Sequence, residues 1–444
     1  MKKNVPEDKI VKGDKKTIRA WVMYDWANSV YQLTIATAIF PIYYNQVTRN
    51  GESTQVNFFG FTAENTVIYS WSIAVAYLVV GMLSPFFSSL ADYTGRRKTF
   101  MKVFTIIGAI SCAMLYFFDP AHIELGVIAF TLGTFGYAAS LVFYNSFLPV
   151  IAEPKDHDRI SAQGYSMGYL GGVVLLLMNL MVILFPGIFG ITDPYLPAKL
   201  SFLSVGIWWI AFSQITFRKL PKYTFRQRTS RKNLLLNGYS ELRKVFHHIL
   251  KDKVLLIYLP GFFFFSTGML TVMFMAASYG EKQLHLGTDV LIPVLLIIQL
   301  VGMAGAWLFS RLSGRIGNIS TLVIAVISWM FICIGAYFID SAIDFVIVAF
   351  FVGMVMGGSQ ALCRSTYSKL LPETTDHTSF FSFYDVMEKL AIILGTFSFG
   401  AIEAITGNMR SSVLSIIVFF AVAMAILLIL RSVASRSPRV SSIH

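Results

Sequence analysis

Charged residues are scarce in this sequence of 444 residues, where Asp, Glu, Lys and Arg make up 14% of the chain. Soluble domains carry roughly 25% charged residues, so a water-soluble protein of several domains is excluded. Cysteine is rarer still: Cys112, Cys333 and Cys363 lie far apart without metal-ligand spacing, which excludes a disulfide framework. All seven histidines lie outside the long apolar runs, so no haem or zinc site held by histidines is expected within those runs.

Hydrophobic residues are abundant, at 55% of the chain, and they gather into repeated runs of about 20 residues. Such a run crosses a bilayer as a helix, because a helix satisfies its own backbone hydrogen bonds in lipid. No small-residue cleavage site follows the first run, so we expect a retained first helix and no signal peptide. The sequence predicts an all-α membrane protein with twelve transmembrane helices at residues 19–45, 68–90, 100–118, 123–148, 160–185, 199–217, 254–279, 288–312, 319–339, 341–368, 379–405 and 410–432.

The basic residues predict how these spans are oriented. If the N-terminus is placed inside and the spans alternate, the inside segments hold 31 of the 36 Lys and Arg residues and the outside segments hold 4. Cytoplasmic loops of membrane proteins carry an excess of Lys and Arg, so both termini are predicted to be cytoplasmic. The formal net charge of +12 is explained in the same way, and no nucleic-acid partner is expected.

The longest connection between spans divides the chain into two halves. It is basic, with Arg226, Arg228, Arg231 and Lys232 in one cluster. Residues 234–250 are predicted to form an amphipathic helix at the inner membrane interface or a solvated linker held near anionic lipid headgroups, and both alternatives stay open. The predicted parts are a cytoplasmic tail 1–18, a six-helix bundle 19–217, the basic linker 218–253, a second six-helix bundle 254–432 and a cytoplasmic tail 433–444.

A loop motif recurs at the corresponding place in each half. The segment from Ser88 to Lys98 follows the second span, and a related segment from Ser310 to Gly317 follows the eighth. The first copy resembles the major facilitator signature Gly-x-x-x-Asp-x-x-Gly-Arg-Arg/Lys, with matches at Asp92, Gly95, Arg96 and Arg97 and with Ser88 in place of the first glycine. The second copy keeps Gly317 and has Gly314 where the acid would stand. We interpret the motif as a cytoplasmic latch of paired charges; the alternative is an ordinary charged turn.

Other strings carry a more specific resemblance. The first span contains Tyr24-Asp25-Trp26-Ala27-Asn28, and the fourth ends in Tyr144-Asn145-Ser146. With further strings in spans five, ten and eleven, the chain resembles the vacuolar effluxer (autophagy-related) branch of the major facilitator superfamily and its bacterial relatives. The resemblance implies a transporter with the major facilitator fold in two six-helix halves, in a bacterial cytoplasmic (inner) membrane. Yeast members of that branch are linked to amino-acid efflux, so the resemblance implies transport more firmly than it implies a cargo.

Ionisable residues within the predicted spans point to a functional layer. Each costs about 2.5–3.5 kcal/mol on insertion scales. At 1.5 Å per residue, Asp25 lies about 9 Å from the cytoplasmic end of its span, and the other charges lie at similar depths. We interpret the layer as an inner gate and coupling site, in which the basic groups pair with the acids when the path is closed to the cytoplasm. The alternative is a structural i, i+4 pair of Asp385 and Lys389 that only tolerates burial. The gate residues are Asp25, Arg364, Asp385, Glu388 and Lys389.

Polar residues in or beside the spans are candidates for solute contacts. They carry amide or phenol groups and come from several spans. The paired acids and bases nearby would suit a zwitterion such as an amino acid. The candidates are Tyr24, Asn28, Gln32, Asn145, Gln163, Gln299, Gln360 and Tyr384.

Taken together, the residues predict a monomeric secondary carrier, active or facilitated, that moves a small solute by alternating access. It is not predicted to be an enzyme: Gly164-Tyr-Ser166-Met-Gly168 fits a nucleophile-elbow pattern but lies within a span, where glycines favour close helix packing. No Gly-Lys-Ser/Thr string is present, so ATP does not drive it directly. No cofactor is expected, and a proton or another ion is the candidate for coupling. A lipid-like cargo carrier and a non-transporting receptor or scaffold with the same fold remain as alternatives.

Overall fold

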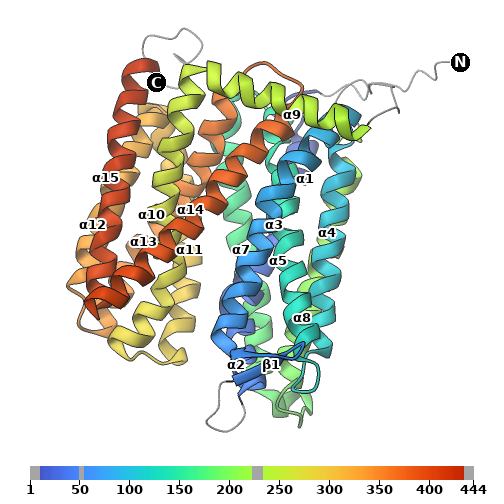
Figure 1. Ribbon diagram of the computed structural model, residues 1–444, viewed down its shortest axis with the longest axis vertical. Coiled ribbons are helices and arrows are strands. Elements are labelled where there is room, and N and C mark those ends of the chain that lie inside the picture. The colour runs from blue at the N-terminus through green and yellow to red at the C-terminus, as the bar shows by residue number, and fades with distance from the viewer. Residues whose placement is uncertain (1–10, 50–54, 223–233, 435–444) are drawn as a thin grey trace, which may run out of the picture. The chain divides into compact units, whose positions relative to one another are not determined.

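The computed structural model describes residues 11–49, 55–222 and 234–434, and nearly all of them are helical (Figure 1). Eleven helices are long and apolar enough to cross a membrane. A further span is made of three contiguous pieces, α1 (Lys15–Val30), the π-helix η1 (Tyr31–Ile39) and α2 (Phe40–Thr48). With this first span the described residues supply the twelve predicted transmembrane helices.

Proline accounts for the irregular first span. Pro41 lies in the first turn of α2, and its ring lacks the N–H that would complete the ladder to Thr37. The ladder ahead of it changes to π-type hydrogen bonds, and the Thr37 hydroxyl donates to the Gln32 carbonyl at 2.8 Å. The sequence did not predict this change, which places Gln32 on a widened turn.

The described residues divide by packing into two compact units. Of the described residues, the N-terminal unit comprises 15–49, 55–144 and 167–222, and the C-terminal unit comprises 11–14, 145–166 and 234–434. Helix α7 (His157–Leu184) therefore begins in the C-terminal unit and continues in the N-terminal one.

After the first span, the N-terminal unit contains a short β-hairpin and then long helices. Residues Phe59 and Gly60 both have positive φ, 50° and 83°, which is the geometry of a tight two-residue hairpin turn. The elements are β1 (Gln55–Phe58), β2 (Phe61–Glu64), α3 (Asn65–Thr94), α4 (Arg97–Met114), η2 (Leu115–Phe117), α5 (Ile123–Asn145), most of α7, η4 (Pro186–Phe189) and α8 (Leu196–Lys219).

The C-terminal unit starts from the short connection between α5 and α7. After the connection it contains one crosswise helix, α9, followed by six long helices that run back and forth (Figure 1). The elements are α6 (Leu148–Ile151), η3 (Pro154–Asp156), α9 (Leu234–Lys251), α10 (Lys253–Leu284), α11 (Thr288–Ile316), α12 (Asn318–Tyr337), α13 (Ala342–Leu370), α14 (His377–Thr406) and α15 (Met409–Ala434).

Helix α9 falls on the part of the linker for which a helix was one alternative. Val245 is buried, and Phe246 stacks on Phe383 with ring centroids 5.9 Å apart. The segment is therefore a helix docked on the end of the C-terminal unit, and its place at the membrane interface stays a prediction. The basic cluster at Arg226, Arg228, Arg231 and Lys232 lies outside the described residues, as do most of both tails.

Small residues let the helices approach closely. A Cβ atom added at Gly357 on α13 would collide with the backbone of Gly302 on α11, and one at Gly353 would lie 2.6 Å from the Ile298 carbonyl. In the N-terminal unit, Gly168 and Gly172 of α7 face Ser29 and Leu33 of the first span. These contacts confirm that the glycines serve helix packing.

Candidate functional site

The first loop motif is a buried ion pair beside a left-handed turn. Helix α3 ends at Gly95 with φ 68°, a conformation that costs other L-residues energy. This turn brings Arg97, at the start of α4, back onto Asp92, with Nη2 3.0 Å from Oδ1 and both side chains fully buried. Ser88 is also buried, whereas Arg96 is exposed. The geometry is that of a charge-paired turn, as expected of the latch motif; its opening and closing stay a prediction.

The second loop motif receives its acid from another helix. Gly317 joins α11 to α12 with φ 84° and ψ 157°, a region essentially restricted to glycine. Asp158, in the first turn of α7, lies at this turn and accepts hydrogen bonds from Ser313 Oγ at 2.9 Å and Asn318 Nδ2 at 2.7 Å. Lys369 Nζ of α13 lies 2.6 Å from Asp158 Oδ2, with both side chains 8% exposed.

Sequence reasoning missed this cluster, because the acid comes from the residues just before the fifth predicted span and not from the repeated loop. A usable signal was present: Asp158 and Lys369 each stand at the end of an apolar run, where a charge is easily taken for a solvated one. Lys369 also donates to Asn318 Oδ1 at 2.8 Å, so the ion pair is embedded in a polar network that stabilises it in a buried place.

Asp25 lies in the N-terminal unit among aromatic residues. Its side chain is 5% exposed, and the Tyr144 hydroxyl donates to Asp25 Oδ2 at 2.7 Å. Trp21 donates to the Tyr144 carbonyl at 3.0 Å and stacks on its ring at 4.5 Å, while the Tyr24 hydroxyl bonds Thr105 Oγ1 at 2.6 Å. The carboxylate is therefore held in a fixed orientation by a residue of α5 that sequence reasoning did not select.

Asn28 lies one turn further along α1. It is 1% exposed, and its Nδ2 has no hydrogen-bond partner among the described residues. Buried side-chain donors are nearly always satisfied in proteins, so this unsatisfied amide keeps Asn28 a candidate for a solute contact.

Arg364 fastens the connection between α5 and α7 to α13. It is 1% exposed; its Nε donates to Ser161 Oγ at 2.9 Å and its Nη2 to the Ser161 carbonyl at 2.8 Å. Its Nη1 donates to Asn145 Oδ1 at 3.3 Å, and the guanidinium lies 4.2 Å from the centre of the Tyr165 ring. All of these contacts lie within the C-terminal unit, and each partner belongs to residues 145–166. A guanidinium is planar and has five N–H donors, so it can bond several groups at once.

The charges of α14 form one local group. Lys389 Nζ lies 3.1 Å from Asp385 Oδ1 and 3.2 Å from Glu388 Oε2. Asp385 and Lys389 are nearly fully buried, whereas the Glu388 side chain is 31% exposed. Asp385 Oδ2 has no partner among the described residues. The i, i+4 pair of the structural alternative is thus present, together with a third, more accessible carboxylate.

The remaining solute candidates are scattered. Tyr384 is buried and stacks on Phe262 at 4.1 Å. Gln360 is partly buried and donates to Met273 Sδ at 3.8 Å. Gln32 and Gln299 are partly buried, and Gln163 is exposed. Within their own units, the geometry joins Tyr24, Asp25 and Asn28 along one helix and Asn145 with Arg364. Among the described contacts none is common to the four glutamines.

Solved structures identify the fold as that of major facilitator transporters. The fucose transporter FucP in its outward conformation aligns with a TM-score of 0.69 at 11% identity, over 94% of this chain and 98% of that one. The proton:xylose symporter XylE aligns with a TM-score of 0.68 at 12% identity, over 92% and 93%. A bacterial homologue of the iron transporter ferroportin aligns with a TM-score of 0.62 at 10% identity, over 95% and 100%. The chain therefore has the major facilitator fold, and the twelve-helix prediction is confirmed.

Sequence comparison then gives the family. The profile described as "Vacuole effluxer Atg22 like" matches residues 13–438, so the chain belongs to this family. An uncharacterized MFS-type transporter, YxiO of Bacillus subtilis (strain 168), is 30% identical over 93% of this chain and 94% of its own length. Autophagy-related protein 22-1 of Aspergillus clavatus is 25% identical over 81% of this chain and 72% of its own. The resemblance drawn from the Tyr-Asp-Trp-Ala-Asn string is therefore confirmed.

Proposed function

We propose that this protein is a secondary carrier that moves a small zwitterionic solute, with amino acids as the first candidates, by alternating access. The observation that supports the proposal best is the set of buried charges on α1, α13 and α14. Burying Asp25, Arg364, Asp385 and Lys389 within membrane helices costs free energy, which a structural protein has no need to spend. Opposite charges on separate helices suit the ammonium and carboxylate groups of an amino acid.

Arg364 is the proposed gate residue. Its three described hydrogen bonds hold residues 145–166 to α13. Opening the transport path to the other side of the membrane requires one part of the chain to move relative to another. Hydrogen bonds made by a single charged side chain can break and reform during such a movement. In this proposal, opening releases Ser161 and Asn145 from the guanidinium, which then becomes available to a carboxylate of the solute.

Glu388 and Asp25 are the proposed coupling acids. Glu388 is the accessible member of the α14 group, beside Lys389. If Glu388 takes a proton, Lys389 keeps Asp385 as its partner, so the buried ammonium is never left unpaired. Asp25 can take a proton while keeping the hydrogen bond from Tyr144. Either event would tie a proton to movement of the gate.

The decisive experiment is uptake by proteoliposomes holding the purified protein. Labelled amino acids, sugars, nucleosides and lysolipids are offered one class at a time, with and without an imposed pH gradient. Uptake of amino acids above empty vesicles is the expected result. Uptake of lysolipids alone would favour the lipid-like cargo carrier, and no uptake or exchange of any class would contradict transport of a small solute.

Two variants of α14 give a matched test of coupling. Glu388 and Glu403 lie on the same helix, each beside a lysine, with side chains 31% and 30% exposed. Glu388→Gln is expected to abolish stimulation of uptake by the pH gradient, and Glu403→Gln is expected to retain it. Equal stimulation in both variants would remove Glu388 from the coupling mechanism and leave Asp25→Asn as the next test.

The gate is tested by a substitution of Arg364 that keeps the positive charge but changes the hydrogen-bond geometry. Arg364→Lys preserves one positive charge and loses the fork that reaches both Ser161 and Asn145. Because a hydrogen bond to a charged group contributes about 1.5–3 kcal/mol, we expect the uptake rate to change about tenfold or more. Arg431→Lys, at an exposed position at the end of α15, is the control and should leave uptake unchanged. An unchanged rate in Arg364→Lys would overturn the gate.

We also propose that both termini and the linker 218–253 face the cytoplasm of a bacterial inner membrane, with six-helix halves at 19–217 and 254–432. The excess of Lys and Arg in one set of loops supports this topology. Reporter fusions after Lys219 and after Leu284 should report opposite sides, cytoplasmic and external respectively. Reversal of both reporters would overturn the orientation.

A further inference from the structure

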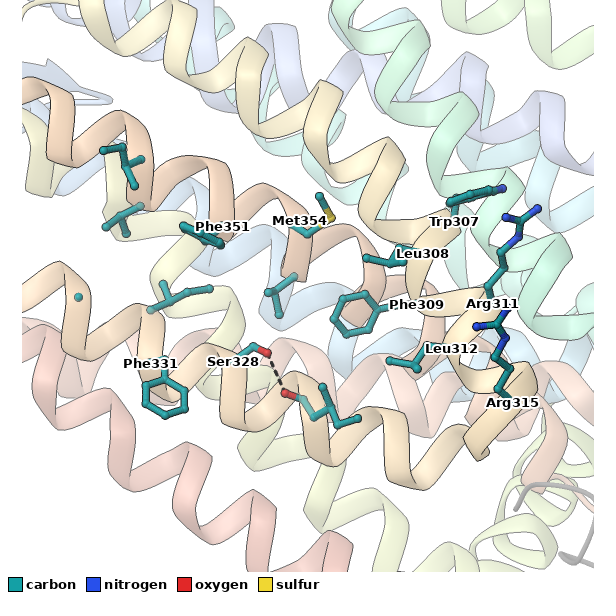
Figure 2. Close-up of a pocket in the computed structure, with 16 residues that line it drawn as sticks. Trp307, Leu308, Phe309, Arg311, Leu312, Arg315, Ser328, Phe331, Phe351 and Met354 are labelled. Carbon is teal, nitrogen blue, oxygen red and sulfur yellow. Dashed lines mark hydrogen bonds between the residues drawn. The ribbon is translucent and has the colours of Figure 1, made fainter.

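The C-terminal unit carries a groove on its surface that none of the proposed transport residues line. It has a volume of about 820 Å³ and lies among α11, α12 and α13 (Figure 2). This volume is in the range of small-molecule binding sites. Apart from Arg311, Arg315 and Ser328, the groove wall is apolar, and Trp307, Phe331 and Phe351 in it are each more than half exposed.

The polar groups of the groove are unevenly placed. Ser328 lies along the wall, and its hydroxyl donates to the Ile324 carbonyl at 2.9 Å, so its polarity is already satisfied (Figure 2). Both arginines lie at one end, with Arg311 beside Trp307 and Arg315 further along α11 (Figure 2). The groove is thus apolar along its length and cationic at one end.

The two arginines are arranged for an anion. They stand four residues apart on α11, where like charges repel by about 0.2–0.5 kcal/mol. Neither has an ion-pair partner among the described residues. The guanidinium of Arg311 lies over the Trp307 ring, 3.8 Å from its centre, which restricts its orientation at the mouth of the groove. A phosphate between the two would relieve the repulsion and accept charge-assisted hydrogen bonds from both.

The length of the groove fits one leaflet of a bilayer. Its wall on α12 runs from Ile324 to Gly335, about 16 Å at 1.5 Å per residue. The hydrocarbon core of a bilayer is about 30 Å thick, so this is about one leaflet. Arg315 lies next to the end of α11, which is where the headgroups of that leaflet would be.

We propose that this groove binds one anionic phospholipid, with its phosphate between Arg311 and Arg315 and an acyl chain along the apolar wall formed by α12 and α13. The occupant is distinct from the transported solute, and the inference does not depend on transport. Under the proposed topology this end of α11 is cytoplasmic, where anionic lipids attract basic side chains by about 1 kcal/mol each.

Native mass spectrometry of the whole protein in detergent tests the proposal. The protein is titrated with phosphatidylglycerol or with phosphatidylcholine of the same acyl chains. One phosphatidylglycerol is expected to bind more tightly than phosphatidylcholine. Arg311→Ala/Arg315→Ala should weaken phosphatidylglycerol binding about 30-fold, since two charges are lost at about 1 kcal/mol each, and should abolish the preference over phosphatidylcholine.

Lys253→Ala/Arg431→Ala is the matched control, because it removes two exposed basic residues of the same unit that do not line the groove. It should keep the preference. If the control loses the preference as much as the arginine pair does, the binding follows net charge and the site is overturned. Arg311→Lys/Arg315→Lys serves if the alanine pair does not fold, and it should bind with intermediate affinity.

The tail-binding part has a test of its own. A Cβ atom at Gly335 would have only Val348 nearby, at 3.8 Å, so Gly335→Phe fills the groove with little strain. This variant should bind phosphatidylglycerol more weakly with both arginines intact. Brominated acyl chains should quench the tryptophan fluorescence of the parent protein more than that of Trp307→Phe. Glycerol 3-phosphate that binds as tightly as the lipid, or unchanged lipid binding in Gly335→Phe, would overturn the lipid assignment.

Discussion

Breaking the ion pair between Asp158 and Lys369 should strongly destabilise the protein. The pair is short, 2.6 Å, and both side chains are 8% exposed. Asp158→Asn keeps the shape and most of the hydrogen bonding with Ser313 and Asn318, but it leaves the ammonium of Lys369 buried beside neutral groups. Removing one partner of a buried ion pair costs about 3–5 kcal/mol, because the other charge loses its compensation without regaining water.

The three cysteines provide the assay. All three are buried thiols, so a thiol-reactive dye reports unfolding of the purified protein in detergent as each becomes accessible. Asp158→Asn should lower the unfolding midpoint at least three times as much as Lys282→Met. The control breaks a pair with Glu403 that is 3.5 Å long and whose lysine side chain is 61% exposed, and exposed pairs contribute only about 0–1 kcal/mol.

A second variant separates the charge effect from a general packing defect. Asp158→Asn/Lys369→Met removes both charges and should recover most of the lost stability, since replacing a buried pair by neutral groups is often nearly neutral. The reasoning is refuted if Asp158→Asn is no less stable than the control, or if the double variant is less stable than Asp158→Asn alone.

Three further outcomes are expected in the same assay. Gly357→Ala should lower stability by about 1–3 kcal/mol through overpacking against α11, whereas Gly314→Ala, which has open space around its Cβ, should raise it by about 0.5–1 kcal/mol; equal effects would contradict the packing argument. Gly317→Ala should lower stability by about 1–3 kcal/mol because of its φ of 84°, and a neutral result would mean that the turn relaxes. For Asp119, outside the spans, burial raises the pKa, but hydrogen bonds from His122 and Ala121 and the charges of His122 and Lys199 outweigh it and hold the pKa below its usual range. This carboxylate therefore contributes stability above an unfolded pKa of about 3.9, and that stability is lost as pH falls through the lower folded pKa. Between about pH 4 and pH 3, the unfolding midpoint of Asp119→Asn should fall less than that of the parent protein. An identical fall would exclude Asp119 as a source of the pH dependence.

Much of the fold was predictable because the thickness of the membrane sets the length of the apolar runs in the sequence. A helix that crosses lipid needs a long apolar run, so the spans could be counted without knowledge of tertiary contacts. Pro41 shows the limit of this reasoning. A proline within an apolar run predicts some irregularity, but whether the helix kinks, ends or widens into π-type turns depends on the side chains that pack around it.

The contacts of the charged residues likewise fall into those that sequence spacing predicts and those that it does not. Asp92 and Arg97 stand five positions apart across a glycine, so their pairing is local and could be anticipated from the motif. The i, i+4 spacing of Asp385 and Lys389 likewise predicts the contact that the structure has. The partners of Arg364 could not be anticipated, because Ser161 and Asn145 are separated from it by 203 and 219 residues.

The sequence by itself determined that this chain crosses the membrane repeatedly, that it belongs among the major facilitator proteins and that Asp25, Arg364, Asp385 and Lys389 are buried. These features follow from hydropathy and from short-range spacing, which the chain carries wherever it folds. Only the tertiary structure decided that Asp158 supplies the acid missing from the second loop motif and that the start of α7 belongs to the C-terminal unit. It also decided that Arg311 and Arg315 lie at the end of an apolar groove. Each of these depends on helices that are distant in sequence and meet only when their surfaces pack.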